Sequence, residues 1–347
     1  MDDNAQKDLI LKKSLLKDEV KHIDITSFDS RVIINQMQSM SFVAREIGKA
    51  AEILNLMVKD DESVNILVIA GSSSAAGCLD VYQKMAECNI IDAVVATGAS
   101  IIDMDFFEAL GFKHYQGTQF SDDNLLRTLG IDRIYDTFID EDELQKCDHK
   151  IYEIANSLEP KVYSSMEFIK ELGRWLSKSK EKKKSLIQTC FQKNIPIFCP
   201  AFSDCSAGFG LVKHQNENLS SHISIDSVKD FRQLTEIKIN SKNTGLFMIG
   251  GGVPKNFIQD TVICAEMINK KVNMHKYAIQ ITVADQRDGA CSSSTLKEAS
   301  SWGKVDTQYE QMVFSEATEA VPLIISDVYH RGFWKKRKQK NLLNIFE

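Results

Sequence analysis

The chain has 347 residues, of which 43 % are hydrophobic and 26 % charged, as expected for one large globular domain or two ordinary ones. Its formal net charge of −6 gives no support for nucleic-acid binding. The sequence contains no run of about 18 apolar residues, which is the length needed to cross a membrane. The polar, acidic start of the chain shows no signal-peptide pattern, so we expect a cytoplasmic protein.

The cysteines and histidines indicate neither a structural crosslink nor a metal site. The eight cysteines form no C-x-x-C pair, and some lie in apolar runs such as residues 195–199. We therefore expect buried free thiols, which are usual in a large cytosolic chain. The seven histidines are scattered without metal-ligand spacing, and we predict that no metal is bound.

The first part of the chain is predicted to be helical. Residues 1–25 are charged and weakly amphipathic, and we expect them to form an N-terminal helical arm. Residues 30–59 carry apolar side chains at helical spacing and are predicted to form one long helix. Residues 111–150 are polar, and we interpret them as an irregular excursion, whereas residues 331–347 form a basic tail that we predict to be solvated.

Apolar strands that end in small polar residues recur through the chain. β-Branched and other apolar runs predict buried strands at residues 64–70, 91–97, 194–202, 245–249 and 277–283. The small polar loops that follow them are residues 71–77, 97–100, 203–208, 250–252 and 285–295. The loops that follow the strands of a parallel sheet meet at one edge, where open α/β sheets bind ligands.

This alternation predicts an α/β fold: a single Rossmann-like domain over residues 26–330, with a mostly parallel central sheet of about six strands flanked by helices. The three glycines at 250–252 would let the backbone approach a phosphate, and the loops together fit a dinucleotide better than a single phosphate. A tight turn without a ligand explains residues 71–77 equally well. Asp103 could bind a ribose hydroxyl or simply lie in the first turn of a helix.

One lysine is the best candidate for covalent chemistry. Lys304 follows Trp302 and Gly303, and Glu298 and Asp288 lie upstream. A lysine amine can act as a nucleophile, and an aromatic face with carboxylates suits a polycationic amine. A hydride-accepting cofactor near Lys304 would let an amine be oxidised to an imine and captured as a Schiff base. A surface lysine beside a core tryptophan is the alternative interpretation.

Five stretches, in this order, resemble the deoxyhypusine synthase family, and most of all its bacterial deoxyhypusine synthase-like branch. They are residues 70–77, 96–100, 200–204, 250–255 and 298–304, and the last resembles the family's active-site lysine motif. The resemblance covers nearly the whole chain. It implies NAD-dependent transfer of an aminobutyl group from spermidine, through a lysine imine, to an acceptor amine, in a homotetramer with sites at subunit interfaces.

The resemblance also implies roles for single residues. Lys304 would carry the imine, and Trp302, Glu298 and Asp288 would bind the polyamine. The residues that would hold NAD are Ser72, Ser73, Thr97, Gly98, Asp103, Asp204, Gly250, Gly251, Gly252 and Glu316.

The sequence departs from the family pattern around the polyamine. Asn256 and Phe257 occupy the positions of a histidine pair in the eukaryotic enzymes, and Phe209 and Cys291 stand where aspartates are expected. The acceptor is therefore open between putrescine, which would give homospermidine, and a protein lysine, which would give deoxyhypusine. A non-catalytic NAD-binding or polyamine-sensing protein is the alternative function.

Overall fold

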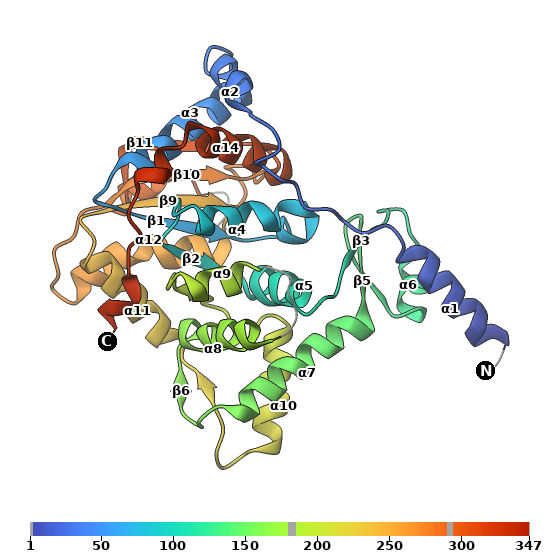
Figure 1. The fold of residues 1–347 in the computed structure, drawn as a ribbon. Coiled ribbons are helices and arrows are strands. Elements are labelled where there is room, and N and C mark those ends of the chain that lie inside the picture. Colours follow the sequence, from blue (N-terminus) through green and yellow to red (C-terminus); the bar gives the residue numbers. More distant parts are fainter. Residues whose placement is uncertain (1–2, 180–184, 290–293, 347) are drawn as a thin grey trace.

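A computed structural model of the protein describes residues 3–179, 185–289 and 294–346 (Figure 1). Within these ranges, none of the helices combines the length and the apolar character that a membrane crossing requires. The helices are α1 Asp3–Leu15, α2 Arg31–Met37, α3 Phe42–Lys59, α4 Leu79–Glu87, α5 Phe107–Ala109, α6 Asp123–Thr128, α7 Glu141–Ser157, α8 Ser165–Lys178, α9 Leu186–Gln192, α10 Ser206–Glu217, α11 Ser227–Ile239, α12 Gly252–Met267, α13 Leu296–Ser301 and α14 Ala317–Arg331.

The centre of the molecule is a six-stranded sheet in the order β11-β10-β9-β1-β2-β7. Every neighbouring pair is parallel, which confirms the predicted α/β fold with a parallel central sheet. The strands are β1 Ser63–Ile69, β2 Ala93–Ala96, β7 Ile197–Phe198, β9 Asn243–Ile249, β10 His275–Ile281 and β11 Val305–Val313.

Helices cover both faces of this sheet, and the strands divide their side chains between them. Leu67 and Ile69 of β1 pack with residues of α3, α4 and α14. Ile66 and Val68, which point the other way, pack with residues of α11, α12 and α13. Because both faces are buried, the strands are continuously apolar rather than alternating, which is the pattern that made them predictable.

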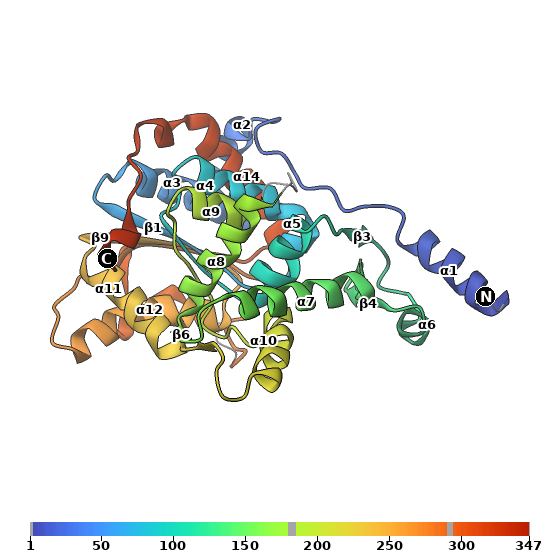
Figure 2. The same ribbon diagram turned by 60° about the horizontal axis from the view of Figure 1, so that its bottom comes forward.

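A second, small sheet holds the N-terminal arm. Strands β3 His114–Gln116, β4 Ile131–Ile134 and β5 Thr137–Asp140 form an antiparallel sheet in the order β3-β5-β4. Helix α1 projects from the body beside it (Figures 1 and 2), and the Lys12 Nζ lies 2.8 Å from Asp140 Oδ1. The prediction that residues 111–150 are irregular is therefore wrong. These strands have only three or four residues each, too few to show a clear alternation.

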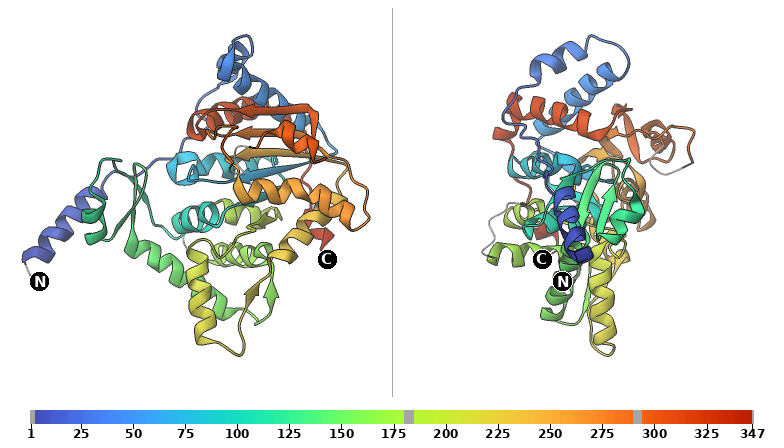
Figure 3. Two further views of the ribbon diagram at one scale, coloured as in Figure 1. Left: turned by 180° about the vertical axis from the view of Figure 1, so that it is seen from behind. Right: turned by 90° about the vertical axis from the view of Figure 1, so that its right-hand side faces the viewer.

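The prediction of one helix over residues 30–59 is also wrong, because the segment forms two helices. Helix α3 begins at Phe42, whose φ of 57° is left-handed and breaks the helical path. A side chain on Gly48 would lie only 2.8 Å from Gln38, so glycine allows the turn to pack closely on α3. Helix α2 consequently folds back beside α3, where its Ile34 is buried in the core, and it is the blue helix at the top of both views in Figure 3.

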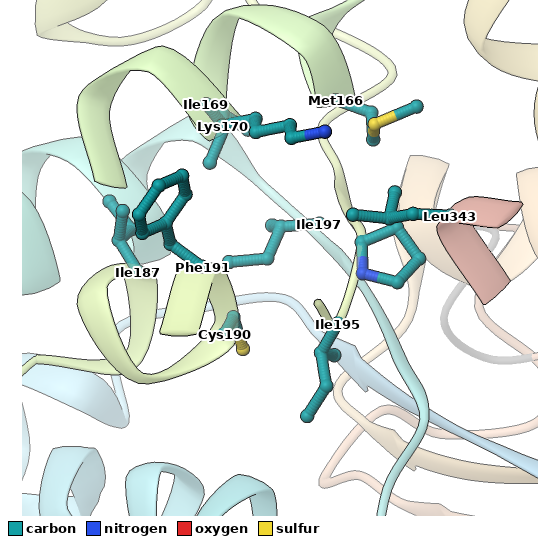
Figure 4. Close-up of a pocket in the computed structure, with 10 residues that line it drawn as sticks. Met166, Ile169, Lys170, Ile187, Cys190, Phe191, Ile195, Ile197 and Leu343 are labelled. Carbon is teal, nitrogen blue, oxygen red and sulfur yellow. The ribbon is translucent and has the colours of Figure 1, made fainter. Parts of the chain in front are cut away.

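The basic tail is not simply solvated, which corrects the prediction for residues 331–347. The Arg337 guanidinium forms two hydrogen bonds with the Asp92 carboxylate, of 2.9 and 2.5 Å, and both side chains are 1 % exposed. Further along, Leu343 closes a small apolar pocket between α8, α9 and the segment at β7 (Figure 4). The tail is therefore anchored across the amino-terminal ends of β1 and β2.

Candidate active site

The connections between strands place a crevice at the carboxyl ends of β1 and β9. From β1 the chain proceeds to β2 and β7 on one side, and it then returns to β9 on the other side of β1. Neighbouring strands whose connections leave in opposite directions create an opening at their carboxyl ends, which is where open α/β sheets bind ligands. The loops that begin at Gly71 and Gly250 border this opening.

A cleft of about 200 Å³ lies at this point. Four of the predicted cofactor residues line it, namely Ser72, Ser73, Gly250 and Glu316. Glu316 also caps α14 by accepting a 2.7 Å hydrogen bond from the Thr318 amide. The complete lining is Ala70, Gly71, Ser72, Ser73, Ile249, Gly250, Ile281, Thr282, Val283, Ser315, Glu316 and Ala317.

The backbone of the cleft has the features of an anion cradle. Gly71, Gly250 and Gly252 have φ values of 85°, 72° and 65°, which glycine adopts without strain. A Cβ on Gly71 or Gly252 would meet no atom within 4 Å, so the backbone is open there, whereas at Gly250 it would lie 2.8 Å from the Ala70 carbonyl. Helix α12 begins here at Gly252, and its N-cap residue Gly251 provides no side-chain cap, which leaves the first N–H groups of the helix to bind an anion such as a pyrophosphate.

Thr97 and Gly98 support the cleft from the neighbouring strand rather than lining it. The Ser100 hydroxyl donates to the Gly71 carbonyl at 3.0 Å, and Thr97 Oγ1 lies 3.0 Å from the same hydroxyl. A side chain on Gly98 would lie 2.4 Å from the Cys205 sulfur, so packing alone accounts for a glycine here.

Asp103 and Asp204 lie near the start of α10, outside the cleft lining. The Asp103 carboxylate accepts a 2.8 Å hydrogen bond from the Ser206 amide, the first residue of that helix. Burial raises the pKa of Asp103 to about 6. Asp204 is exposed in the preceding turn. In this chain Asp103 therefore acts as an acid that caps the start of α10.

The backbone of Lys304, directly before β11, forms hydrogen bonds through both its N–H and its carbonyl. Its N–H donates to the Ala299 carbonyl at 3.0 Å, and its carbonyl accepts from the His275 amide at 2.9 Å. The side chain is 16 % exposed, and its Nζ lies 2.5 Å from Asp260 Oδ1. The Nζ also lies 5.3 Å from the centre of the Trp302 ring, and Trp302 is itself 69 % exposed.

Asp260 is a residue of this site that sequence reasoning missed. It lies in the middle of α12, the helix that begins at the glycine loop of the cleft. Its only sequence signal was its place three residues after Phe257, on the partly exposed side of the helix. The packing of α12 brings it to Lys304, 44 positions away, and no spacing rule predicts such a contact.

The other predicted polyamine residues are exposed. Glu298 accepts a 2.6 Å hydrogen bond from the Thr295 amide in a capping box at the start of α13. Asp288 lies in a turn, in which its backbone amide donates a hydrogen bond to the Asp285 carbonyl. Just before α13, the Ser294 hydroxyl accepts a 2.9 Å hydrogen bond from the Nζ of buried Lys255.

Three of the four departures from the family pattern can be located. Phe257 packs its ring against Phe231, with centroids 4.9 Å apart, and Asn256 is partly exposed beside it. Phe209 is 69 % exposed on α10. Cys291 lies outside the described residues. The seven cysteines within the described part of the chain are free thiols.

Within one chain, Lys304 does not approach the cleft, which corrects the expectation that it lies beside the cofactor. It precedes β11, whereas Glu316 follows that strand, and the nine residues of the strand span roughly 30 Å. The physical reason is the parallel sheet itself. The crossover through α13 returns the chain to the amino-terminal edge, so a residue just before a strand lies opposite the loops that follow strands.

Comparison with known proteins identifies the family. The family model described as deoxyhypusine synthase matches residues 32–328. A deoxyhypusine synthase-like protein of Coxiella burnetii is 62 % identical over 97 % of this chain and 96 % of its own, and one of Caulobacter vibrioides is 60 % identical over 96 % and 92 %. The chain therefore belongs to the deoxyhypusine synthase family.

A solved structure has the same fold. The crystal structure of a candidate deoxyhypusine synthase from Entamoeba histolytica aligns with a TM-score of 0.61 over 93 % of this chain and 99 % of that one. The sequences are 19 % identical in this alignment, so the likeness concerns the fold alone.

Proposed function

We propose that the protein is an NAD-dependent transferase that moves an aminobutyl group from spermidine, or a related polyamine, through an imine on Lys304 to an acceptor amine. The observation that carries this proposal is the position of the Lys304 amine, between the Asp260 carboxylate and the exposed Trp302 ring, in a chain of the deoxyhypusine synthase family. A nucleophilic amine beside an aromatic face and an acid suits a cationic amine substrate.

The cleft would supply part of the site for the dinucleotide that such a transfer requires. The Gly250–Gly252 loop and the uncapped start of α12 would bind the pyrophosphate, and Ser72, Ser73 and Glu316 would bind the adjoining sugars. When bound, NAD accepts a hydride from the donor amine and later returns it to the new imine. Thr97 and Asp103 would support this site through Ser100 and α10.

We further propose that two subunits of a homotetramer share each site. In its own chain, Lys304 is separated from the cleft by the length of strand β11, roughly 30 Å, and a strand cannot contract. This separation supports the shared site. It is also supported by exposed apolar side chains on α12 and next to Lys304: Val253 is 46 % exposed, Met267 79 % and Trp302 69 %. A cleft of about 200 Å³ is also small for a dinucleotide, since ligand pockets usually measure about 300–1,000 Å³.

In this arrangement, the Lys304 side of one subunit faces the cleft of another. Trp302 would hold a substrate ammonium against its ring, and Glu298 and Asp288 would bind the other cationic ends of the polyamine. Lys304 would attack the oxidised carbon of the donor and release diaminopropane. We place the reaction in the cytoplasm, and the acceptor is either putrescine or a protein lysine.

The test is a transfer assay with spermidine labelled in its butyl group. The protein is incubated with NAD and labelled spermidine, with putrescine or with a precursor of the hypusine-containing factor, and the products are separated. We expect label in homospermidine or in the protein acceptor, and none with Lys304→Ala. Binding of NAD without any transfer, for every donor and acceptor tried, would contradict the proposal and favour a polyamine sensor.

A further inference from the structure

We infer that Asp260 is a catalytic residue that takes the proton from the Lys304 ammonium and returns it to the departing amine. This inference rests on the proposed function, because it assigns a role within the same imine transfer. It adds a residue to the site that neither the sequence pattern nor the comparisons mark.

The Asp260 carboxylate and the Lys304 amine are close enough to form an ion pair. Asp260 Oδ1 and Lys304 Nζ lie 2.5 Å apart. Within the described part of the chain, Asp260 is the one carboxylate within ion-pair distance of this amine. The Trp302 ring, 5.3 Å away, can stabilise a cation, but it cannot accept a proton.

Both partners are held in place by the fold rather than by their own contact. Asp260 lies in the 16-residue helix α12, whose buried side includes Ile258, Thr261 and Val262. Lys304 is fixed by two backbone hydrogen bonds, to Ala299 and from His275. The backbone positions from which the carboxylate and the amine approach each other are therefore set by two separate elements.

A purely stabilising ion pair is a poor explanation of this contact. The Asp260 side chain is 39 % exposed and that of Lys304 16 %, and a pair so close to solvent contributes about 0–1 kcal/mol to stability. Removing the carboxylate is therefore expected to leave the protein folded.

The chemistry balances within the transfer step. The Lys304 ammonium gives one proton to Asp260, and the free electron pair of the nitrogen then forms a bond to the electrophilic carbon of the donor iminium. Asp260 returns that proton to the nitrogen that leaves. It then takes a second proton from the Lys304 nitrogen, which still carries two, and passes it to the departing amine, which leaves as an ammonium ion. The carbon–nitrogen bond to the leaving amine breaks with its electron pair on that nitrogen, and an iminium on Lys304 results, paired with the Asp260 carboxylate. No oxidant is consumed in this step.

The test compares the wild type with Asp260→Asn and Asp260→Glu. The protein is first treated with butyraldehyde and cyanoborohydride in the absence of NAD, and the rate of alkylation at Lys304 is followed by peptide mass spectrometry from pH 6 to pH 10. This measures the reactivity of the amine without the cofactor. The same variants are then trapped with borohydride in the presence of NAD and spermidine.

We expect Asp260→Asn to slow both reactions on the order of 10²-fold at pH 7, the size of a general-base contribution. The deficit should shrink as the pH rises, because hydroxide then removes the lysine proton. Asp260→Glu should keep a pH profile like that of the wild type, and neither variant should change Tm or NAD affinity. A merely structural pair would leave both reaction rates and the pH profile unchanged in Asp260→Asn.

The two proposals fail in different ways. An adduct that forms in Asp260→Asn at the wild-type rate, with the wild-type pH profile, would overturn the role of Asp260 alone. An absence of any adduct from NAD and polyamine in the wild type, even though butyraldehyde labels Lys304, would instead overturn the proposed transferase function.

Discussion

Lys304 and Glu316 lie at opposite ends of the nine-residue strand β11. The first carries the amine that we propose as nucleophile, and the second borders the cleft that we propose for the dinucleotide. Strand β11 lies at the edge of the sheet and pairs with β10 along its length, so a loop movement would not bring its two ends together. A working site therefore requires the amine of one subunit and the cleft of another.

Mixing two inactive variants tests this arrangement. Lys304→Ala removes the amine, and Ser72→Trp fills the cleft at a residue that lines it. Each variant alone should be inactive. Subunits unfolded and refolded together should recover roughly a quarter of wild-type activity, because random pairing into two-fold dimers restores one site in each mixed dimer. No recovery, although mixed oligomers form, would show that both residues act within one chain.

Trp302 should bind the donor through its ring. Trp302→Leu keeps an apolar side chain but removes the aromatic face, and it should raise KM for spermidine roughly 2- to 30-fold, the range of a cation–π contribution. The KM of Trp302→Phe for spermidine should lie between the values of Trp302→Leu and the wild type. Steady-state kinetics measures this, and an equal KM for all three proteins would exclude contact between ring and substrate.

Asp103 should make stability depend on pH. Its folded-state pKa of about 6 lies above the usual value of 3.8, so the folded state binds more protons between these two pH values. Stability is therefore expected to be greatest below about pH 4 for this group, and to fall as the pH rises through 6, by on the order of 3 kcal/mol. Asp103→Asn, which can still accept the Ser206 hydrogen bond, should flatten this slope in urea unfolding. A variant with an unchanged slope would show that another group titrates.

Arg337 should contribute strongly to stability although it belongs to a basic tail. Arg337→Ala would leave the Asp92 carboxylate buried without its cation, which typically costs about 3–5 kcal/mol. The neighbouring exposed lysine provides the control, since Lys338→Ala should change the free energy of unfolding by less than about 0.5 kcal/mol. Equal stability of the two variants would show that the tail does not hold β1 and β2.

The fold was largely predictable because its central strands are buried on both faces. Such strands appear as uninterrupted apolar runs, and each is followed by a small polar loop. The elements that sequence reasoning missed lack such signals. The break before Phe42 leaves the helical periodicity intact on both sides, and the strands of the arm sheet are too short to alternate.

The site was predictable only where it follows strand ends. Ser72, Ser73, Gly250 and Glu316 could be grouped because loops after parallel strands share an edge. The contact between Lys304 and Asp260 depends on how α12 packs, and the anchoring of Arg337 by Asp92 depends on where the tail crosses the sheet. Neither contact can be predicted from the spacing of residues along the sequence.

The central claim is that Lys304 forms an imine with an aminobutyl group derived from a polyamine. It is tested most directly by incubating the wild type with NAD and spermidine, reducing with borohydride, and mapping the digested protein by mass spectrometry. We predict an aminobutyl adduct on Lys304 that depends on NAD and is lost in Lys304→Arg. Absence of that adduct with every polyamine donor, in protein that binds NAD, would contradict the account.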